Sequence, residues 1–146
     1  MSVKGISNNP KPGSALLPVL LAANILLVMA VILIKIVYNT YAINYCLNQG
    51  AQAFWLAEAG LERGKVEVVN NPAWYTDLPH VPDDDKVWLE GGAVGQLFPL
   101  GGGSFKLIRE KGKEQLYAVG EQGGGRAIIK LKFVSFPFKV NSWKEL

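Results

Sequence analysis

The chain contains few of the residues from which active sites are most often built. Among its 146 residues there are one cysteine, Cys46, and one histidine, His80. One cysteine excludes an intrachain disulfide, and one histidine excludes a zinc site made from a histidine pair or an HExxH motif. No local motif supports a nucleophile that uses His80 as its base. The sequence predicts no enzyme and no cofactor; we expect His80 to lie in a loop and Cys46 to pack as a small hydrophobe.

Two other polar or glycine-rich features have structural explanations. Asp83, Asp84 and Asp85 could offer oxygen ligands to calcium, but their spacing matches no calcium motif. We favour a solvated turn there and leave calcium binding open. The glycine runs that begin at Gly101 and Gly123 lack the lysine and the following helix of a phosphate loop, so they predict turns.

Charge is missing from one long stretch. Between Pro12 and Lys35 there is no charged residue, and Asn24 is the only one with a strongly polar side chain. The run from Ser14 to Ile34 supplies the roughly 20 residues that a bilayer core of about 30 Å requires. We therefore predict a transmembrane helix over residues 14–34.

The net charge of +3 and the pI near 9.0 do not indicate a nucleic-acid partner. The lysines are scattered along the chain, and no dense basic patch with interleaved aromatic residues appears. Residues 1–13 form a short basic leader with Lys4 and Lys11. A positive flank stays in the cytoplasm, so the chain after Lys35 is expected on the outer side. The residues after the span do not resemble a signal-peptidase site, so we expect the span to be retained.

The predicted helix continues beyond the membrane. No proline occurs from Lys35 to Val69, and Pro72 then supplies a stop signal, so one helix is predicted from Ser14 to Val69. Its second half, residues 35–71, is amphipathic. The predicted apolar face contains Leu47, Phe54, Ala57, Leu61, Gly64 and Val68, and the polar stripe contains Asn44, Asn48 and Gln52. Gly60 and Gly64, with Ala53 and Ala57, form a small-residue face that a sheet or another helix can approach closely.

Residues 72–146 predict a small extracytoplasmic region of loop and sheet. Pro72 to Gly103 reads as an ordered loop laid over the sheet. The alternating segments Ser104 to Glu110, Glu114 to Val119 and Arg126 to Val134 predict a three-stranded antiparallel meander. In the last strand, Ala127, Ile129, Leu131 and Phe133 face one side, while Lys130 and Lys132 face the other. A sheet this small needs a cover for its apolar face, and the amphipathic helix can provide it. The fold class is α+β.

These features together resemble the type IV pilin-like proteins. The resemblance rests on a basic leader ending in Gly13, an apolar helix that starts at Ser14, one long helix and a small antiparallel sheet. The segment QAFWLAEAGLERG, from Gln52 to Gly64, is similar to the corresponding helix segment of minor pilins of the X type and of K-type pseudopilins of type II secretion. The resemblance covers Pro12 to about Pro72 well and the rest in outline.

The resemblance implies a route of maturation and assembly. A prepilin peptidase would cut between Gly13 and Ser14 on the cytoplasmic face, and the new amino terminus at Ser14 would be methylated. The subunit would reside as a single-pass protein in the bacterial cytoplasmic membrane, with its carboxy-terminal domain outside. Other partners would be minor and major pilins or pseudopilins and the assembly platform in the membrane. The mature subunit would then enter a pilus or pseudopilus.

The chain departs from the family pattern at the fifth mature position. Most pilins carry a glutamate there, which can neutralise the amino terminus of a neighbouring subunit, and this chain has Pro18. In the family, absence of this glutamate is associated with the K-type subunit at the filament tip. The resemblance therefore implies an initiating or tip-proximal minor subunit. The alternative is a membrane-anchored binding module that never leaves the bilayer.

Overall fold

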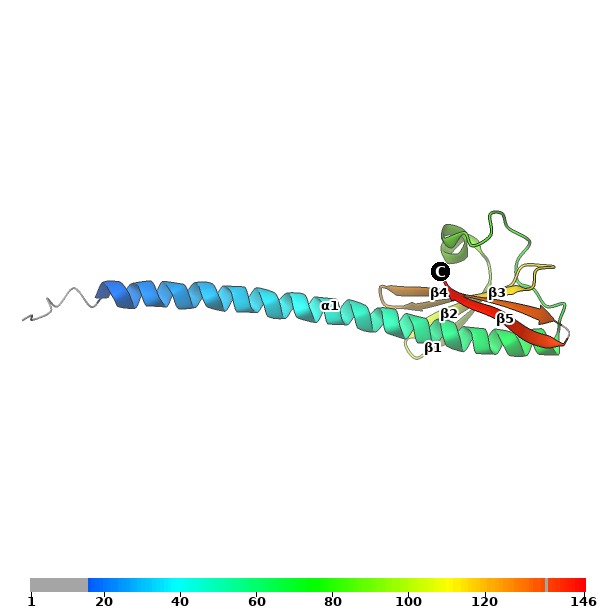
Figure 1. Ribbon diagram of the computed structural model, residues 1–146, viewed down its shortest axis with the longest axis horizontal. Helices are drawn as coiled ribbons and strands as arrows, with labels where there is room; N and C mark the ends of the chain where they lie inside the picture. The colour runs from blue at the N-terminus through cyan, green and yellow to red at the C-terminus, as the bar shows by residue number, and fades with distance from the viewer. Residues whose placement is uncertain (1–15, 136) are drawn as a thin grey trace, which may run out of the picture. The chain divides into compact units, whose positions relative to one another are not determined.

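The structure is a computed structural model that describes residues 16–135 and 137–146. One α-helix, α1 (Leu16–Asn70), is followed by a π-helical turn, η1 (Trp88–Gly92), and five strands (Figure 1). The strands are β1 (Gln96–Leu100), β2 (Gly103–Ile108), β3 (Gln115–Gln122), β4 (Gly125–Ser135) and β5 (Phe138–Glu145). The chain forms two compact units, with the boundary inside α1 after Ile43.

The single long helix predicted from the sequence is confirmed. Within the described residues, α1 has 55 residues and ends one residue after the predicted Val69. Asn71 Oδ1 accepts a hydrogen bond from the Ala73 N–H at 3.1 Å just after the helix. Pro72 follows and cannot continue the helix, because it has no N–H to donate.

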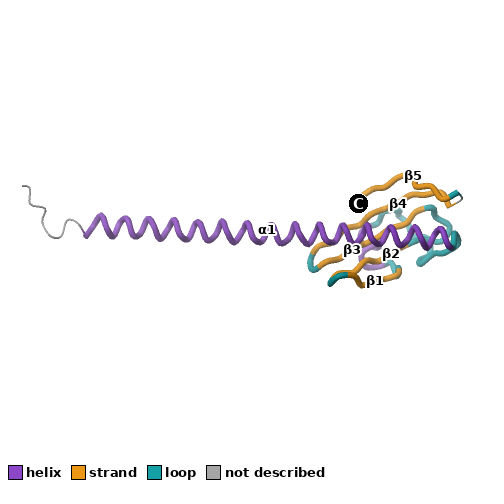
Figure 2. Tube along the Cα trace, turned by 90° about the horizontal axis from the view of Figure 1, so that it is seen from below, coloured by secondary structure: helices purple, strands orange, loops and turns teal. Residues whose placement is uncertain are grey.

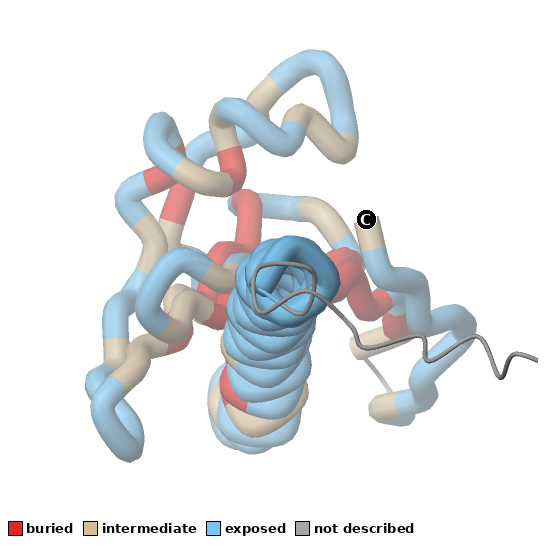
Figure 3. Tube along the Cα trace, turned by 90° about the vertical axis from the view of Figure 1, so that its left-hand side faces the viewer, coloured by how far each residue is buried: buried red, intermediate tan, exposed pale blue. Residues whose placement is uncertain are grey.

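In the first unit, the described residues belong to α1 alone. Each of them, from Leu16 to Ile43, is exposed, and most are large and apolar. The N-terminal part of α1 is coloured as exposed throughout in Figure 3. Among the described residues of this unit, 16–43, none buries the apolar surface that the sequence concentrates here.

In the second unit, the sheet is antiparallel with the strand order β1-β2-β3-β4-β5 (Figure 2). The α+β class and the antiparallel meander are confirmed, but the prediction of three strands is wrong. β1 was predicted as loop because it contains Pro99, which an edge strand tolerates since its outer N–H needs no partner. β5 was missed because its residues are almost all exposed and lack a clear apolar alternation. It nevertheless pairs with β4, for example through Leu131 and Trp143.

One face of the sheet packs on the C-terminal half of α1, as expected. The buried residues of α1 are Ala53, Leu56, Ala57, Gly60, Leu61, Gly64 and Val68, and they pack with Phe105, Leu107, Leu116, Ala118 and Ile129 from β2, β3 and β4. The predicted apolar face was wrong at Leu47, which is 66% exposed. The reason is that the β3–β4 hairpin first meets the helix at Gln49, whose Oε1 accepts a hydrogen bond from the Gly124 N–H at 3.0 Å. Asn44, Asn48 and Gln52 are exposed, in agreement with the predicted polar stripe.

The small-residue face of α1 allows a very close approach by β3. A Cβ atom on Gly120 would lie 2.0 Å from the Ala53 carbonyl oxygen and 2.6 Å from the Ala57 nitrogen. A Cβ on Gly64 would lie 2.4 Å from a methyl group of Leu116. Helix and strand therefore touch backbone to backbone, which glycine alone permits here.

The opposite face of the sheet is covered by residues 71–95, so the second unit has three layers. Leu89 and Ala93 pack with Ile108, Tyr117, Val119 and Ile128 in a second apolar cluster. Figure 1 shows α1 on one side of the sheet and η1 on the other. The predicted ordered loop over the sheet is thereby confirmed, except that its last part forms β1. As predicted, Lys130 lies on the face opposite Ile129 and Leu131, where it is only 5% exposed under this loop, while Lys132 is exposed.

Gly120→Ala should destabilise the second unit by about 3 kcal/mol or more, because the added methyl group meets backbone atoms that cannot rotate away. Gly50→Ala is the matched control, since a Cβ there meets nothing within 4 Å. It should leave stability unchanged or raise it by up to about 1 kcal/mol through helix propensity. Thermal unfolding of the full chain in non-ionic detergent, followed by near-UV circular dichroism, measures both changes. Equal stability of the two variants would contradict the close contact between α1 and β3.

Candidate functional site

The feature of the molecule with the clearest functional meaning is the exposed apolar part of α1. The most apolar stretch of 18 residues in α1 has a mean hydropathy of 2.8, and none of its residues is buried. By length and composition, α1 is the one helix among the described residues that could cross a membrane. A soluble monomer rarely exposes an apolar surface of this extent, so the segment needs lipid or other helices around it.

The C-terminal end of this segment carries a feature that the sequence interpretation missed. Tyr38 and Tyr41 lie one helical turn apart and are 71% and 70% exposed. Tyrosine is enriched at membrane interfaces, where its ring meets the acyl chains and its hydroxyl meets water. The Thr40 hydroxyl donates to the Ile36 carbonyl at 2.9 Å, so this polar group is already satisfied within the helix. The signal was present in the sequence as two tyrosines just after Lys35.

The predicted processing site lies outside the described residues. Gly13 and Ser14, the expected peptidase and methylation positions, are both in that part of the chain. Pro18 is described and lies in α1. Cys46, which we expected to pack as a small hydrophobe, is instead exposed on α1, because no strand reaches the helix at that level.

The three consecutive aspartates each contact different side chains. Asp83 pairs with Lys113 at 2.5 Å, and Asp85 contacts His80 Nε2 at 3.1 Å. Asp84 pairs with the buried Lys130 and accepts a hydrogen bond from the Tyr117 hydroxyl at 2.9 Å. The segment is a turn with Asp83 exposed, in agreement with the favoured solvated turn, while the half-buried Asp84 and Asp85 also anchor the loop over the sheet. Among the residues that the structure describes, no group of three or more acidic, histidine or cysteine side chains could hold a metal ion.

These contacts shift the ionisation of the carboxyl groups downwards. The hydrogen bond from Lys113 lowers the pKa of Asp83, and that from His80 lowers the pKa of Asp85. Burial works to raise the pKa of Asp84, but hydrogen bonds from Lys130 and Tyr117 outweigh it and hold that pKa below its usual range. Burial, with the hydrogen bond to Asp84, raises the pKa of Tyr117. All three aspartates are therefore ionised at neutral pH.

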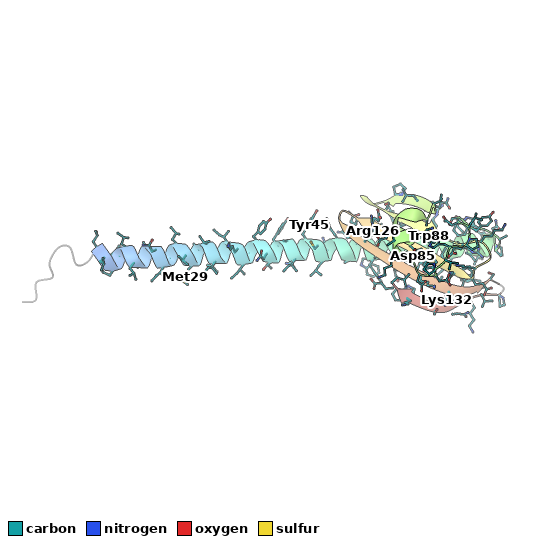
Figure 4. All side chains as sticks on the ribbon, turned by 90° about the horizontal axis from the view of Figure 1, so that it is seen from above. Met29, Tyr45, Asp85, Trp88, Arg126 and Lys132 are labelled. Atoms are coloured by element: carbon teal, nitrogen blue, oxygen red, sulfur yellow. The ribbon has the colours of Figure 1, made fainter. Side chains whose placement is uncertain are left out.

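His80 lies in the same loop, and contacts of its ring and its backbone help to hold the loop in place. Its ring stacks on Trp88 with centroids 4.4 Å apart and an interplanar angle of 5°. Its backbone N–H donates to Glu110 Oε2 at 2.6 Å, and its carbonyl accepts from Lys113 Nζ at 3.0 Å. Asp85 and Trp88 are labelled on the loop in Figure 4. These bonds hold the loop segment against the β2–β3 turn.

Asp77 anchors the other end of this loop. Its carboxylate accepts hydrogen bonds from the Val94 and Gly95 N–H groups at 2.7 and 2.9 Å. Its backbone forms an isolated bridge with Glu110, and its N–H donates to the Arg109 carbonyl at 3.1 Å. Asp77 could not be identified from the sequence, because a lone aspartate in a loop has no distinguishing pattern.

No protein-family model matches the chain, and neither does any curated protein or solved structure. A function is therefore inferred from the chain itself. The observations that bear on it are the exposed apolar helix and the compact unit that follows.

Asp84→Asn should destabilise the second unit by about 1 to 3 kcal/mol at neutral pH, because it leaves the Lys130 ammonium buried without a counter-charge. Asp83→Asn is the control and should change little, since its ion pair is exposed to solvent. The pKa of Asp84 is depressed, so its contribution is present above about pH 4 and disappears as the pH falls through the folded pKa. The difference between wild type and Asp84→Asn in urea unfolding should therefore shrink in acid. A difference that grows in acid would refute the pairing.

A membrane-impermeant maleimide applied from outside should label Cys46 in cells that express the full chain, because this thiol is exposed beyond Tyr41. The double variant Cys46→Ser, Leu27→Cys should resist labelling until the membrane is dissolved, because position 27 would lie in hydrocarbon. Cys46→Ser alone is the blank. Equal labelling at positions 27 and 46 in intact membranes would show that the segment does not span.

Proposed function

We propose that this chain is a minor pilin or pseudopilin that takes part in the initiation and assembly of a type IV pilus or of a type II secretion pseudopilus. The observation that carries the proposal is one continuous helix, Leu16–Asn70, with two different environments. Its apolar first part is exposed, and its second part is the support of an antiparallel sheet. This is the arrangement that the resemblance of the sequence to pilin-like proteins leads one to expect.

In this proposal, the apolar part of α1 has two successive surroundings. Before assembly it spans the cytoplasmic membrane, with the leader inside and residues 44–146 outside. After cleavage at Gly13 and methylation of Ser14, it leaves the bilayer and packs among the helices of other subunits. Lipid tails are as apolar as leucine, so close packing between helices must drive that exchange. The small residues Ala22, Ala23 and Ala30 allow such packing.

Pro18 supports a place at the end of the filament. A carboxylate in an apolar filament core is costly unless it is paired, so interior subunits that carry one need a partner amino terminus. This chain has no carboxylate at that position and needs no such partner. It could therefore begin a filament, as the K-type subunit does in the family.

A second candidate is a membrane-anchored binding module that stays in the bilayer. It is favoured by exposed apolar side chains on the loop over the sheet, namely Leu78, Val81, Val87 and Val94, which are 70% to 84% exposed. Such side chains are suited to a protein partner. The two candidates differ in whether the leader is removed.

Amino-terminal sequencing of the protein from cells with a prepilin peptidase should find methylated Ser14 as the first residue. Gly13→Leu should leave the leader attached, because the peptidase must approach an extended backbone closely at this position. Gly5→Leu is the matched control and should be processed normally, since it lies inside the leader. An intact Met1 in the wild-type protein would refute the pilin assignment and favour the anchored module.

Purified filaments test the tip position separately. Gold-labelled antibody against residues 44–146 should mark filament ends. Uniform labelling along the shaft would exclude the tip, while leaving the assignment as a pilin intact.

A further inference from the structure

Asn24 is the one strongly polar side chain in the apolar stretch from Leu16 to Ile34. It lies eight residues after Leu16, which corresponds to about 12 Å along the helix axis. In the described part of the first unit, the side-chain hydrogen bond that the structure shows belongs to Thr40. The Asn24 carboxamide is exposed and is not engaged there.

The position of Asn24 is costly if the segment spans a membrane. A carboxamide offers two donor hydrogens and an acceptor oxygen, and the hydrocarbon core contains no water to satisfy them. An amide transferred to such a medium without a hydrogen-bond partner is strongly disfavoured. Asn24 therefore requires a polar partner at its own depth.

The side chains around Asn24 form a surface suited to another helix. Leu17, Leu20, Leu21, Ile25, Val28 and Met29 lie beside Asn24 on the same exposed side of α1. Within this set, Leu17, Leu21, Asn24 and Val28 follow the spacing of four, three and four residues that forms the seam of paired parallel helices. Asn24 lies in the middle of that seam.

We propose that two copies of this chain pair in the membrane through this seam, with the Asn24 carboxamides hydrogen-bonded to each other. The inference rests on the proposed membrane span. A second copy inserts in the same direction, so its Asn24 lies at the same depth. The carboxamide is self-complementary, since each group donates to the oxygen of the other. A single asparagine in the seam of a coiled coil fixes register and pairing in the same way.

Energy transfer between copies tests the pairing. The full-length chain is labelled at Cys46, its one cysteine, with a donor or an acceptor dye and is reconstituted in phosphatidylcholine vesicles. Wild type should show energy transfer that persists as lipid is added. Asn24→Leu should weaken pairing by roughly 5- to 30-fold, the range that one hydrogen bond between membrane helices supplies. Asn39→Leu is the matched control and should pair like wild type.

The remaining outcomes separate this inference from the proposed function. Energy transfer equal in wild type and Asn24→Leu, in chains that resist alkaline extraction from the vesicles, would overturn the pairing and leave the span intact. Chains released by alkali would refute the span and the pairing together. Disulfide crosslinking through Cys46 in native membranes should give a homodimer, and products made only with other proteins would exclude a second copy as the partner.

Discussion

The second unit depends on the backbone contact between α1 and β3. Gly120 lets the strand approach the helix so closely that a Cβ atom would overlap the Ala53 carbonyl oxygen. A small antiparallel sheet cannot stand alone in water, because it has too little apolar area on one face. The close contact lets α1 bury Leu107, Leu116 and Ile129 completely. The remaining strands then extend a sheet that is already supported.

Ion pairs and hydrogen bonds attach the loop that covers the other face of the sheet. In the loop over the sheet, the buried apolar side chains are those of Leu89 and Ala93, so charged groups also help to hold it in place. Lys130 and Asp84 join it to β4. In the β2–β3 turn, Glu110, 1% exposed, accepts from the His80 N–H, and Lys113 pairs with Asp83. The second unit is thus covered on both faces of its sheet. The longest continuous exposed apolar stretch belongs to the first part of α1.

Secondary structure was predicted best where apolar residues recur at a regular spacing over a long segment. The long helix and the three central strands were predicted because their apolar residues recur at regular spacing. β1 and β5 were missed since edge strands bury little and tolerate Pro99 or runs of polar residues. The face of Lys130 was predicted, but its burial was not, because alternation assigns a face and cannot tell whether a loop covers it. The tyrosines Tyr38 and Tyr41 could have been recognised from the sequence but were overlooked. The anchoring roles of Asp77 and Glu110 could not, because they depend on contacts between residues distant in the sequence. Gly13 and Ser14 stay predictions from the resemblance.

The hydrogen bond between Gln49 and the β3–β4 hairpin marks where intrachain support of the helix begins in the second unit. In the first unit, residues 16–43 are exposed and contribute to no core. Natural selection can therefore change those side chains without testing whether the sheet still folds. Their identities would record only the chemistry of whatever surrounds them, whether acyl chains or neighbouring helices. The two halves of α1 are therefore under different selective constraints.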